Sequence, residues 1–281
     1  MTFAPALPAP VGSTGWQARL ALDFACRDGR TELVRQQHQG PLLVQRVFHP
    51  EPAGTAHAYL LHPPGGMVAG DVLAVRAALA AGSRALITTP AAGKTYRRGE
   101  GGPVHLDQRL EVADGAALEL LPQESILYDG AALVAGQQVR LAGNAAYIGW
   151  EMISFGRPAS GERFTHGSLR QHWHIEREGL PLWIERLHLE PEAMDATWGL
   201  DGQPCLGTFV ACPAPADADV IARSVLPDLP TLGVTQIGEV LIARYLGPDM
   251  HQLKALFLQL WQALRPHITG VPAIPPRVWA T

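Results

Sequence analysis

Near its start the chain reads Trp16-Gln17-Ala18-Arg19-Leu20-Ala21-Leu22-Asp23-Phe24-Ala25-Cys26, in which the larger apolar side chains recur at every second position. Side chains of a β-strand point alternately to its two faces, so a period of two predicts a half-buried strand. One face would carry Trp16, Ala18, Leu20, Leu22, Phe24 and Cys26, and the other Gln17, Arg19 and Asp23. The next residues, Asp28-Gly29, are typical of a tight hairpin turn.

Patterns of this kind continue through most of the chain. Short runs of strand-forming residues are separated by turns that contain glycine, and many short strands at such spacing predict a mainly β architecture. The further predicted strands are 31–37, 42–47, 56–61, 72–79, 85–89, 104–112, 117–121, 125–128, 138–141, 146–153, 167–175 and 182–189.

A weak internal repeat involves Gly82, Gly115 and Gly143, which each precede a similar strand start and are spaced by 33 and then 28 residues. The spacing suggests layered short strands stacked along an axis in an elongated body, although Ala-Gly turns could also recur by chance in an alanine-rich chain. Polar residues that follow these strands would then line up along one side of the stack. They are Thr88-Thr89-Pro90 with Lys94, Pro122-Gln123-Glu124, and Trp150-Glu151.

From about residue 205 the pattern changes to a β-α-β-β-α order. Strands are expected at 206–212, 232–236 and 239–245, and a helix at 217–225. A second helix begins after Pro248-Asp249, carries apolar residues at three- and four-residue spacing, and is expected to stop at Pro266. We therefore predict a disordered leader at 1–15, a β body at 16–204 and a small two-helix α+β subdomain at 205–281 that packs on the body.

Composition narrows the class of protein. The 281 residues are 47% hydrophobic and 17% charged with a net charge of −4, which is typical of a globular chain. No block of basic residues predicts nucleic-acid binding, and no apolar run reaches the roughly 18 residues that span a membrane. Three scattered cysteines, Cys26, Cys205 and Cys212, form no CxxC motif and fit a reducing, cytoplasmic environment.

The loop His62-Pro63-Pro64-Gly65-Gly66…Gly70-Asp71 is the most specific local feature. The two prolines fix φ and remove two backbone donors, while the glycines allow positive φ or close approach of the backbone. Such a loop is specified residue by residue and ends on one carboxylate. An ordinary tight connection with a solvated Asp71 is the alternative.

Glu124, Glu151, Glu162 and Glu185 stand beside strand or turn residues. Glu151 and Glu185 lie within apolar strands, where an unpaired carboxylate is costly. One hypothesis is a carbohydrate-active hydrolase with paired glutamates, and another is a polar interior that passes a cation. Alternatively, Glu185 forms an ion pair with Arg186 and Glu151 points outward.

Two other motifs give weaker evidence for a functional site. His172 and His174 lie on one face of a predicted strand and could contact a metal ion, but no further ligands stand nearby. The run Ala92-Gly93-Lys94-Thr95 resembles the end of a phosphate-binding loop, yet Thr88 occupies the position of the required first glycine. Nucleotide binding is therefore not predicted there.

Several segments in order resemble the urease accessory protein UreD family, also called UreH in some bacteria. The resemblance covers about residues 16–281. It rests on Leu60-Leu61-His62-Pro63-Pro64-Gly65-Gly66…Gly70-Asp71, Leu86-Ile87-Thr88-Thr89-Pro90-Ala91-Ala92-Gly93-Lys94-Thr95-Tyr96-Arg97, Leu120-Leu121-Pro122-Gln123-Glu124, Trp150-Glu151…Gly156-Arg157…Ser160-Gly161-Glu162, Leu182-Trp183-Ile184-Glu185-Arg186-Leu187 and Trp261…Leu264-Arg265-Pro266…Pro276-Arg277-Val278-Trp279.

The resemblance implies a non-enzymatic maturation factor. Such proteins bind the urease apoprotein and, with UreF and the GTPase UreG, assist insertion of nickel into the urease active site. It implies no tightly bound cofactor, only Ni²⁺ in transit, along a path that carries over to Asp71, Glu151 and Glu185. Loose carboxylate ligation suits an ion in transit better than a His/Cys site. The other residues that the motifs single out are His62, Pro63, Pro64, Gly65, Gly66, Lys94, Gln123, Glu124, Arg157, Glu162 and Arg186.

Overall fold

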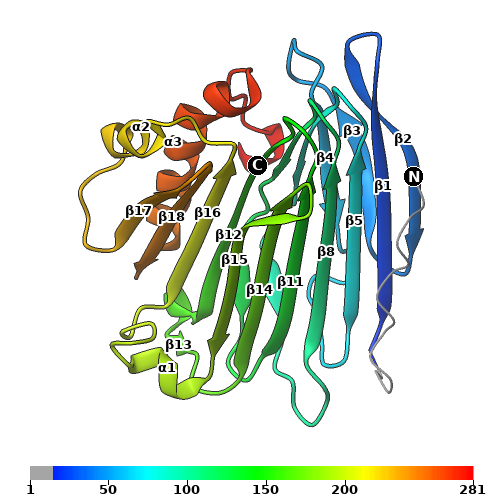
Figure 1. Cartoon of the computed structure of the whole chain (residues 1–281). Helices are drawn as coiled ribbons and strands as arrows, with labels where there is room; N and C mark the ends of the chain where they lie inside the picture. Colours follow the sequence, from blue (N-terminus) through cyan, green and yellow to red (C-terminus); the bar gives the residue numbers. More distant parts are fainter. Residues whose placement is uncertain (1–14, 281) are drawn as a thin grey trace.

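The computed structural model describes residues 15–280 as two large β-sheets with a few helices (Figure 1). The first sheet contains β1 (Gln17–Arg27), β2 (Arg30–Gln39), β5 (Val72–Leu79), β8 (Val104–Val112), β11 (Ala132–Leu141), β14 (Ser168–Arg177) and β15 (Leu180–Leu189). The second contains β3 (Leu43–Phe48), β4 (Ala56–Leu61), β6 (Arg84–Thr88), β7 (Gly93–Thr95), β9 (Ala117–Leu120), β10 (Ser125–Leu127), β12 (Ala146–Arg157), β13 (Glu162–Arg163), β16 (Cys205–Cys212), β17 (Leu232–Ile237) and β18 (Val240–Gly247).

The helical segments are short except for the last α-helix. They are η1 (Pro158–Ser160), α1 (Pro191–Asp195), α2 (Ala218–Val225), α3 (Met250–Thr269) and η2 (Arg277–Ala280). The mainly β prediction is confirmed. Most of the predicted leader, residues 1–14, lies outside the described residues.

The chain passes back and forth between the two sheets and so builds a solenoid. The first sheet has the order β15-β14-β11-β8-β5-β1-β2, and the main path of the second is β17-β18-β16-β12-β9-β6-β4-β3. The neighbours β5, β8, β11 and β14 are parallel, as are β4, β6, β9 and β12. Each coil therefore consists of a strand in the first sheet, a tight turn, a strand in the second sheet and a longer return loop (Figure 1).

The predicted internal repeat corresponds to these coils. The amide of Ala117 donates to the carbonyl of Ser83 over 2.8 Å, and the amide of Ala146 donates to the carbonyl of Ala116 over 2.8 Å. The turns at Gly82, Gly115 and Gly143 thus lie one above the next, and their positive φ values explain the glycines. The alternative of chance recurrence is wrong.

The main hydrophobic core fills the space between the two sheets. Ala18, Leu20, Leu22 and Phe24 of β1 are at most 1% exposed, as the alternation in the sequence predicts. Trp16 and Cys26, which the same pattern places on this face, are exposed. They stand at the two ends of the strand, where the second sheet no longer covers it.

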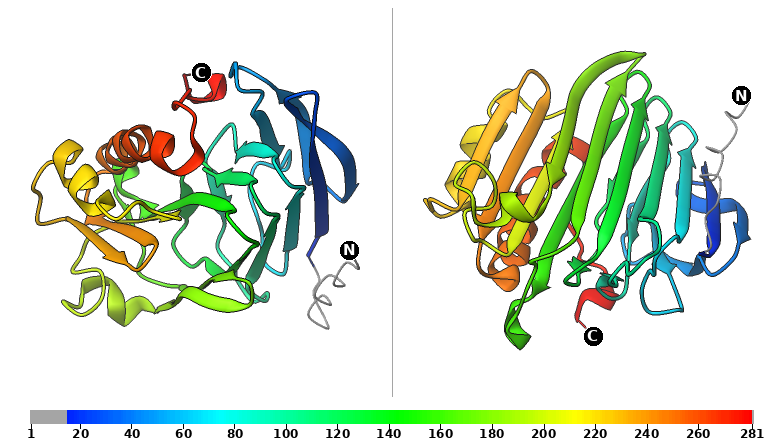
Figure 2. Two further views of the ribbon diagram at one scale, coloured as in Figure 1. Left: turned by 45° about the horizontal axis from the view of Figure 1, so that its top comes forward. Right: turned by 90° about the horizontal axis from the view of Figure 1, so that it is seen from below.

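The C-terminal residues extend the second sheet and cover its outer face. β16 pairs with β12, and β18 pairs with β16, so these strands continue the sheet of the body. Helices α2 and α3 pack on this extension and form a second hydrophobic cluster around Phe209, Phe257 and Trp261 (Figure 2). The division into a body and a subdomain stays a prediction.

Pro266 does not end the last helix, as the sequence had suggested. It lies inside α3, and the helix ends at Gly270, whose φ is 75° and whose amide donates to the carbonyl of Pro266. Proline removes one hydrogen bond and is tolerated here because it is within the last turn, where neighbouring contacts hold the chain. The main contacts of this kind are made by Arg265, which is fully buried and whose guanidinium contacts Glu119 and Glu51.

Candidate functional site

Four of the six segments that carry the family resemblance run into loops at one end of the solenoid, whereas 182–187 lies within β15 and 261–279 includes the end of α3. The tight glycine turns lie at the end where the chain enters the second sheet. The long return loops, residues 62–71, 89–103, 121–131 and 158–167, lie at the opposite end, with β13 and α1, at the bottom of Figure 1. The prediction that polar residues align along one side of the stack therefore agrees with the coil geometry.

A cavity of about 510 Å³ opens between the sheets near this end. Its wall combines many apolar side chains with a few polar ones. The polar members are His62, Thr89, Lys94, Gln108, Gln123, Ser125, Gln137 and Glu151, and the loop Pro63–Met67 forms part of the rim. The arrangement is typical of a binding site in which few polar groups fix orientation.

The proline-glycine loop is tied to the next return loop. The amide of Met67 donates to the Lys94 carbonyl over 2.7 Å, and the amide of Tyr96 donates to the Met67 carbonyl over 2.9 Å. A Cβ at Gly66 would lie 2.4 Å from the ring of Tyr96, so only glycine fits there. The two motifs therefore form one unit on the cavity rim.

Asp71 ends the loop, and its side-chain carboxylate accepts hydrogen bonds from backbone amides. It is 4% exposed, and its two carboxylate oxygens accept hydrogen bonds from the amides of Trp16 at 2.8 Å and Val68 at 2.9 Å. Burial lowers the pKa of nearby His62, and the charge of Asp71 opposes this shift. Asp71 is not among the residues that line the cavity. Its membership of a nickel path stays a prediction.

Glu151 lies on the cavity wall and points inward between the sheets. Gln171 of β14 donates a hydrogen bond to its carboxylate. Burial raises the pKa of Glu151 to about 7, and a hydrogen bond from Trp173 opposes the shift. The alternative that Glu151 points outward is wrong. Burial and the charge of Glu151 also raise the pKa of Tyr147 well above its ordinary value.

A chain of polar side chains runs beside Glu151 across the interior. The hydroxyl of Tyr147 donates to Gln137 over 2.7 Å, and Gln137 in turn donates to Gln108 over 2.9 Å. Gln137 and Gln108 also line the cavity. The space between the sheets is thus polar at this level, although most of the core is apolar.

Glu185 is the second interior carboxylate. It pairs with Arg244 of β18, so the predicted ion pair with its neighbour Arg186 is wrong. Successive side chains of a strand point to opposite faces, which directs Arg186 to the exposed side of β15. Within residues 15–280, the Oε1 atom of Glu185 is buried without a hydrogen-bond partner. In the strand pairing Glu185 lies opposite Trp173, the residue that hydrogen-bonds Glu151.

Gln123 and Glu124 form hydrogen bonds at the rim of the cavity, Gln123 through its side chain and backbone and Glu124 through its carbonyl. The Gln123 side chain accepts a hydrogen bond from Lys254 of α3 over 2.5 Å, and the backbone amide of Gln123 donates to the Thr89 hydroxyl over 2.9 Å. The carbonyl of Glu124 accepts from the Gly93 amide over 2.8 Å. Gln123 therefore connects the last helix to the cavity.

Arg157 and Glu162 form an ion pair that closes the return loop after β12. The Arg157 Nε atom lies 3.0 Å from Glu162, and the guanidinium stacks on the ring of Tyr128 at 4.6 Å. Glu162 also accepts from the Asp129 amide at 3.2 Å. The rings of Tyr128 and Tyr96 are in contact, with centroids 4.9 Å apart. These contacts link the segment 156–162 to the proline-glycine loop.

The remaining candidates lie elsewhere. His172 and His174 stack on the outer face of the first sheet with ring centroids 6.3 Å apart, away from the cavity. Among residues 15–280 there is no group of three or more His, Cys, Asp or Glu side chains that could hold a metal ion. In the same part of the chain, no helix is both long and apolar enough to cross a membrane.

Sequence reasoning missed three residues that complete the interior: Gln171, Arg244 and Lys254. Gln171 could have been found, because it lies two positions before Trp173 and so on the same strand face. Arg244 and Lys254 carried no such signal, since their partners are distant in sequence.

The fold and the site define a class: a β-solenoid whose coils enclose a mainly apolar cavity with a few polar groups, and whose return loops carry the specific motifs. Residues 17–280 match the family described as UreD urease accessory protein. The chain belongs to this family.

Similar curated proteins cover almost the whole chain. The urease accessory protein UreD 2 of Brucella anthropi is 43% identical over 274 residues, with 96% of this chain and 100% of the relative covered. UreD proteins of Methylobacillus flagellatus and Pseudomonas putida are 42% identical over 274 residues and 43% over 284 residues. Coverage is 95% of both chains for the former and 100% of both for the latter.

Proposed function

We propose that this chain is a maturation factor for urease with no catalytic activity of its own. It binds the urease apoprotein and, together with UreF and the GTPase UreG, assists insertion of nickel into the urease active site in the cytoplasm. The observation that carries this proposal is the family match over residues 17–280. Relatives that this chain matches over their full length are named urease accessory proteins, which supports a role beside the enzyme.

The interior supports a further part of the proposal, that Ni²⁺ passes through the protein as cargo. Glu151 stands on the cavity wall, and Glu185 lies beyond Trp173 in the same interior. Carboxylates are weak ligands for nickel compared with imidazole or thiolate, so they can pass an ion on. Near neutral pH a substantial share of Glu151 is protonated, because burial raises its pKa to about 7. An arriving cation would displace that proton.

The experiment separates the scaffold from the conduit. Glu151→Gln keeps the size of the side chain and removes its charge. The variant is co-expressed with the urease subunits, UreF and UreG, and both partner retention in a pull-down and nickel per urease are measured. We expect unchanged retention and nickel content lowered several-fold. The control is Glu192→Gln, an exposed carboxylate on α1.

The two parts can fail separately. Normal nickel content with Glu151→Gln would disprove passage along Glu151 and leave the scaffold intact. Failure of the unchanged protein to retain urease or UreF would disprove the scaffold itself.

A further inference from the structure

The end of the solenoid that carries the return loops also has an open polar cleft of about 630 Å³. Its walls come from the loops after β7 and β10, the start of β14 and the segment before α1. The charged side chains that line it are Arg97, Arg98, Asp129, His166, Arg170 and Glu190. This cleft is separate from the cavity that contains Glu151, and the two share no lining residue.

The acids of the cleft are already engaged by the protein itself. Asp129 accepts hydrogen bonds from the amides of Thr165 at 2.7 Å and His166 at 2.8 Å. Although burial opposes it, these hydrogen bonds hold the pKa of Asp129 below its ordinary value. Glu190 lies 3.0 Å from His188. Neither carboxylate is left to neutralise the arginines fully.

The arginines of the cleft keep open donors. The side chain of Arg97 is 72% exposed and approaches Asp129 only to 3.7 Å. Arg98 is exposed, and within residues 15–280 its side chain has no hydrogen bond or ion pair. Arg170 is exposed, and its Nε lies 3.2 Å from Nε2 of His188, the nitrogen that also contacts Glu190. In the part of the chain that the structure describes, the terminal nitrogens of Arg170 have no hydrogen bond. A guanidinium suits carboxylates because its planar fork matches their geometry.

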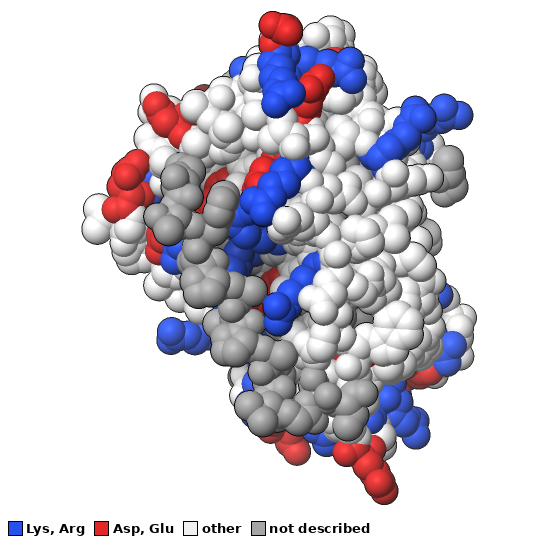
Figure 3. Space-filling model, turned by 90° about the vertical axis from the view of Figure 1, so that its right-hand side faces the viewer, with Lys and Arg blue, Asp and Glu red and all other residues white. Residues whose placement is uncertain are grey.

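Other charged faces of the molecule differ from this cleft. On the side of β1 and β2, basic and acidic side chains are mixed (Figure 3). Arg76, for example, contacts both Asp23 and Glu111 at 2.8 Å. Opposite charges thus offset each other there. In the cleft, three arginines stand beside only two carboxylates, which other groups of the protein already contact, in a chain whose net charge is −4.

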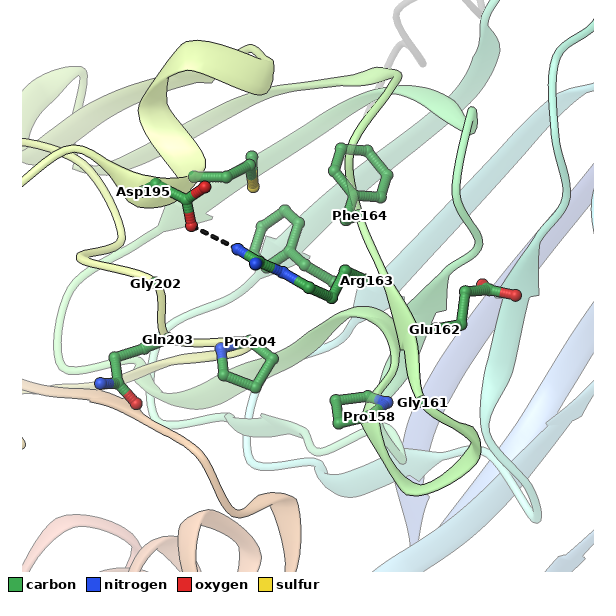
Figure 4. A pocket seen from close by; sticks show the side chains of 11 residues that line it. Pro158, Gly161, Glu162, Arg163, Phe164, Asp195, Gly202, Gln203 and Pro204 are labelled. Carbon is green, nitrogen blue, oxygen red and sulfur yellow. Dashed lines mark hydrogen bonds and ion pairs between the residues drawn. The ribbon is translucent and has the colours of Figure 1, made fainter.

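An apolar pocket of about 260 Å³ adjoins the cleft. Phe155, Phe164, Met194 and Pro204 form the apolar part of its wall, Gln203 belongs to the polar part, and the two phenylalanine rings meet edge to face. Arg163 spans its mouth toward Asp195 at 2.5 Å, and Glu162 points away from the pocket on the other side of β13 (Figure 4). The segment 161–170 borders both the pocket and the cleft.

We propose that the cleft and the pocket together dock an acidic segment of a partner protein that carries one bulky apolar residue. The apolar residue enters the pocket, and carboxylates on one side of it contact Arg97, Arg98 and Arg170. Apolar anchors in pockets dominate the affinity of interfaces, and surrounding charges add specificity and speed of association. The inference goes beyond the proposed function and holds whether or not nickel passes through the protein.

Fluorescence anisotropy with labelled synthetic peptides tests this docking site on the full chain. The probe is a short peptide of aspartate and glutamate with one central phenylalanine. We expect saturable binding that weakens roughly tenfold in Arg98→Glu and in Arg170→Glu. The plugging variant Gln203→Trp, on the pocket wall, should weaken it by a similar factor. Thermal unfolding of each variant verifies that the fold is intact.

Two controls make the outcome decisive. Arg27→Glu makes the same change of charge at a 65% exposed arginine at the far end of β1, and it should bind as the unchanged protein does. A peptide with alanine in place of phenylalanine should bind clearly more weakly. The proposal would be overturned if both peptides bound equally well, or if Arg27→Glu weakened binding as much as Arg98→Glu and Arg170→Glu do. Either result would mean that binding depends only on general charge attraction. Equal or tighter binding of a short oligonucleotide would overturn it as well.

Discussion

Glu185 of β15 forms its ion pair with Arg244 of β18, and this contact joins the edge of the first sheet to the C-terminal extension of the second. The guanidinium also lies 6.0 Å from the ring centroid of Trp183. The side chains of Glu185 and Arg244 are 19% and 34% exposed, so the pair is mostly shielded from water. The adjacent residue Arg186 takes no part in it.

The first prediction concerns this pair. Arg244→Met leaves the carboxylate of Glu185 partly buried without its cation, which should lower the free energy of unfolding by about 1–3 kcal/mol. Arg186→Met is the matched control and should change it by less than about 0.5 kcal/mol. Urea unfolding measures both. Equal effects of the two substitutions would show that the pairing is not the one described.

The second prediction is a pH dependence caused by Glu151. Its pKa of about 7 in the folded protein lies above the ordinary value of 4.5, so the native state keeps a proton that the unfolded chain releases. Stability contributed by this group therefore falls as pH rises from about 4.5 to about 7, by up to about 3 kcal/mol.

Urea unfolding at about pH 5 and about pH 8 tests the prediction. Glu151→Gln cannot titrate and should lose less stability between the two conditions than the unchanged protein. Glu192→Gln, an exposed control on α1, should follow the unchanged protein. The assignment of the pKa fails when Glu151→Gln shows the same loss.

The third prediction concerns the charge cluster beneath α3. Arg265 is 0% exposed and contacts Glu119 at 2.8 Å and Glu51 at 2.7 Å. Arg265→Met leaves the buried carboxylates of Glu119 and Glu51 without their cation, which should lower the free energy of unfolding by about 3–5 kcal/mol. Lys254→Met, on the same helix, loses one hydrogen bond and should cost about 1 kcal/mol.

Hydrogen exchange of the α3 amides reports whether the helix loosens locally in Arg265→Met. Relative to the unchanged protein, we expect the substitution to raise the exchange rate more in α3 than in β1, because the cluster attaches the helix to the second sheet. Exchange that rises equally in both elements would instead indicate a global role for Arg265.

The fourth prediction compares two glycines. Gly66→Ala places a Cβ 2.4 Å from Tyr96 and should destabilise the protein by about 1–3 kcal/mol, because the ring must shift. Gly102→Ala meets no atom within 4 Å and needs no positive φ, so it should be tolerated. Thermal unfolding ranks the two variants, and a harmless Gly66→Ala would contradict the packing of Tyr96 on this loop.

Local patterns in the sequence were sufficient for much of the fold. The period of two in β1, the strands β4, β5 and β8, and the repeated glycine turns depend on neighbours in the chain. The extents of β11 and β12 were underestimated, because Gly136 and Gly156 interrupt the pattern that pairing with neighbouring strands sustains. Pro266 was misjudged for a similar reason: contacts of α3 with the sheet outweigh a local helix breaker.

The candidate site divides in the same way. The motifs indicated the family and singled out Glu151, Glu185 and the loop that ends at Asp71, but they left the direction of both glutamates open. Only the tertiary structure decided that Asp71 binds two backbone amides, that Glu185 pairs with Arg244, and that the return loops meet at one end. Spacing along a strand determines the face of a side chain. Its partner depends on which distant coil lies beside it, and the stacking of the whole chain sets that.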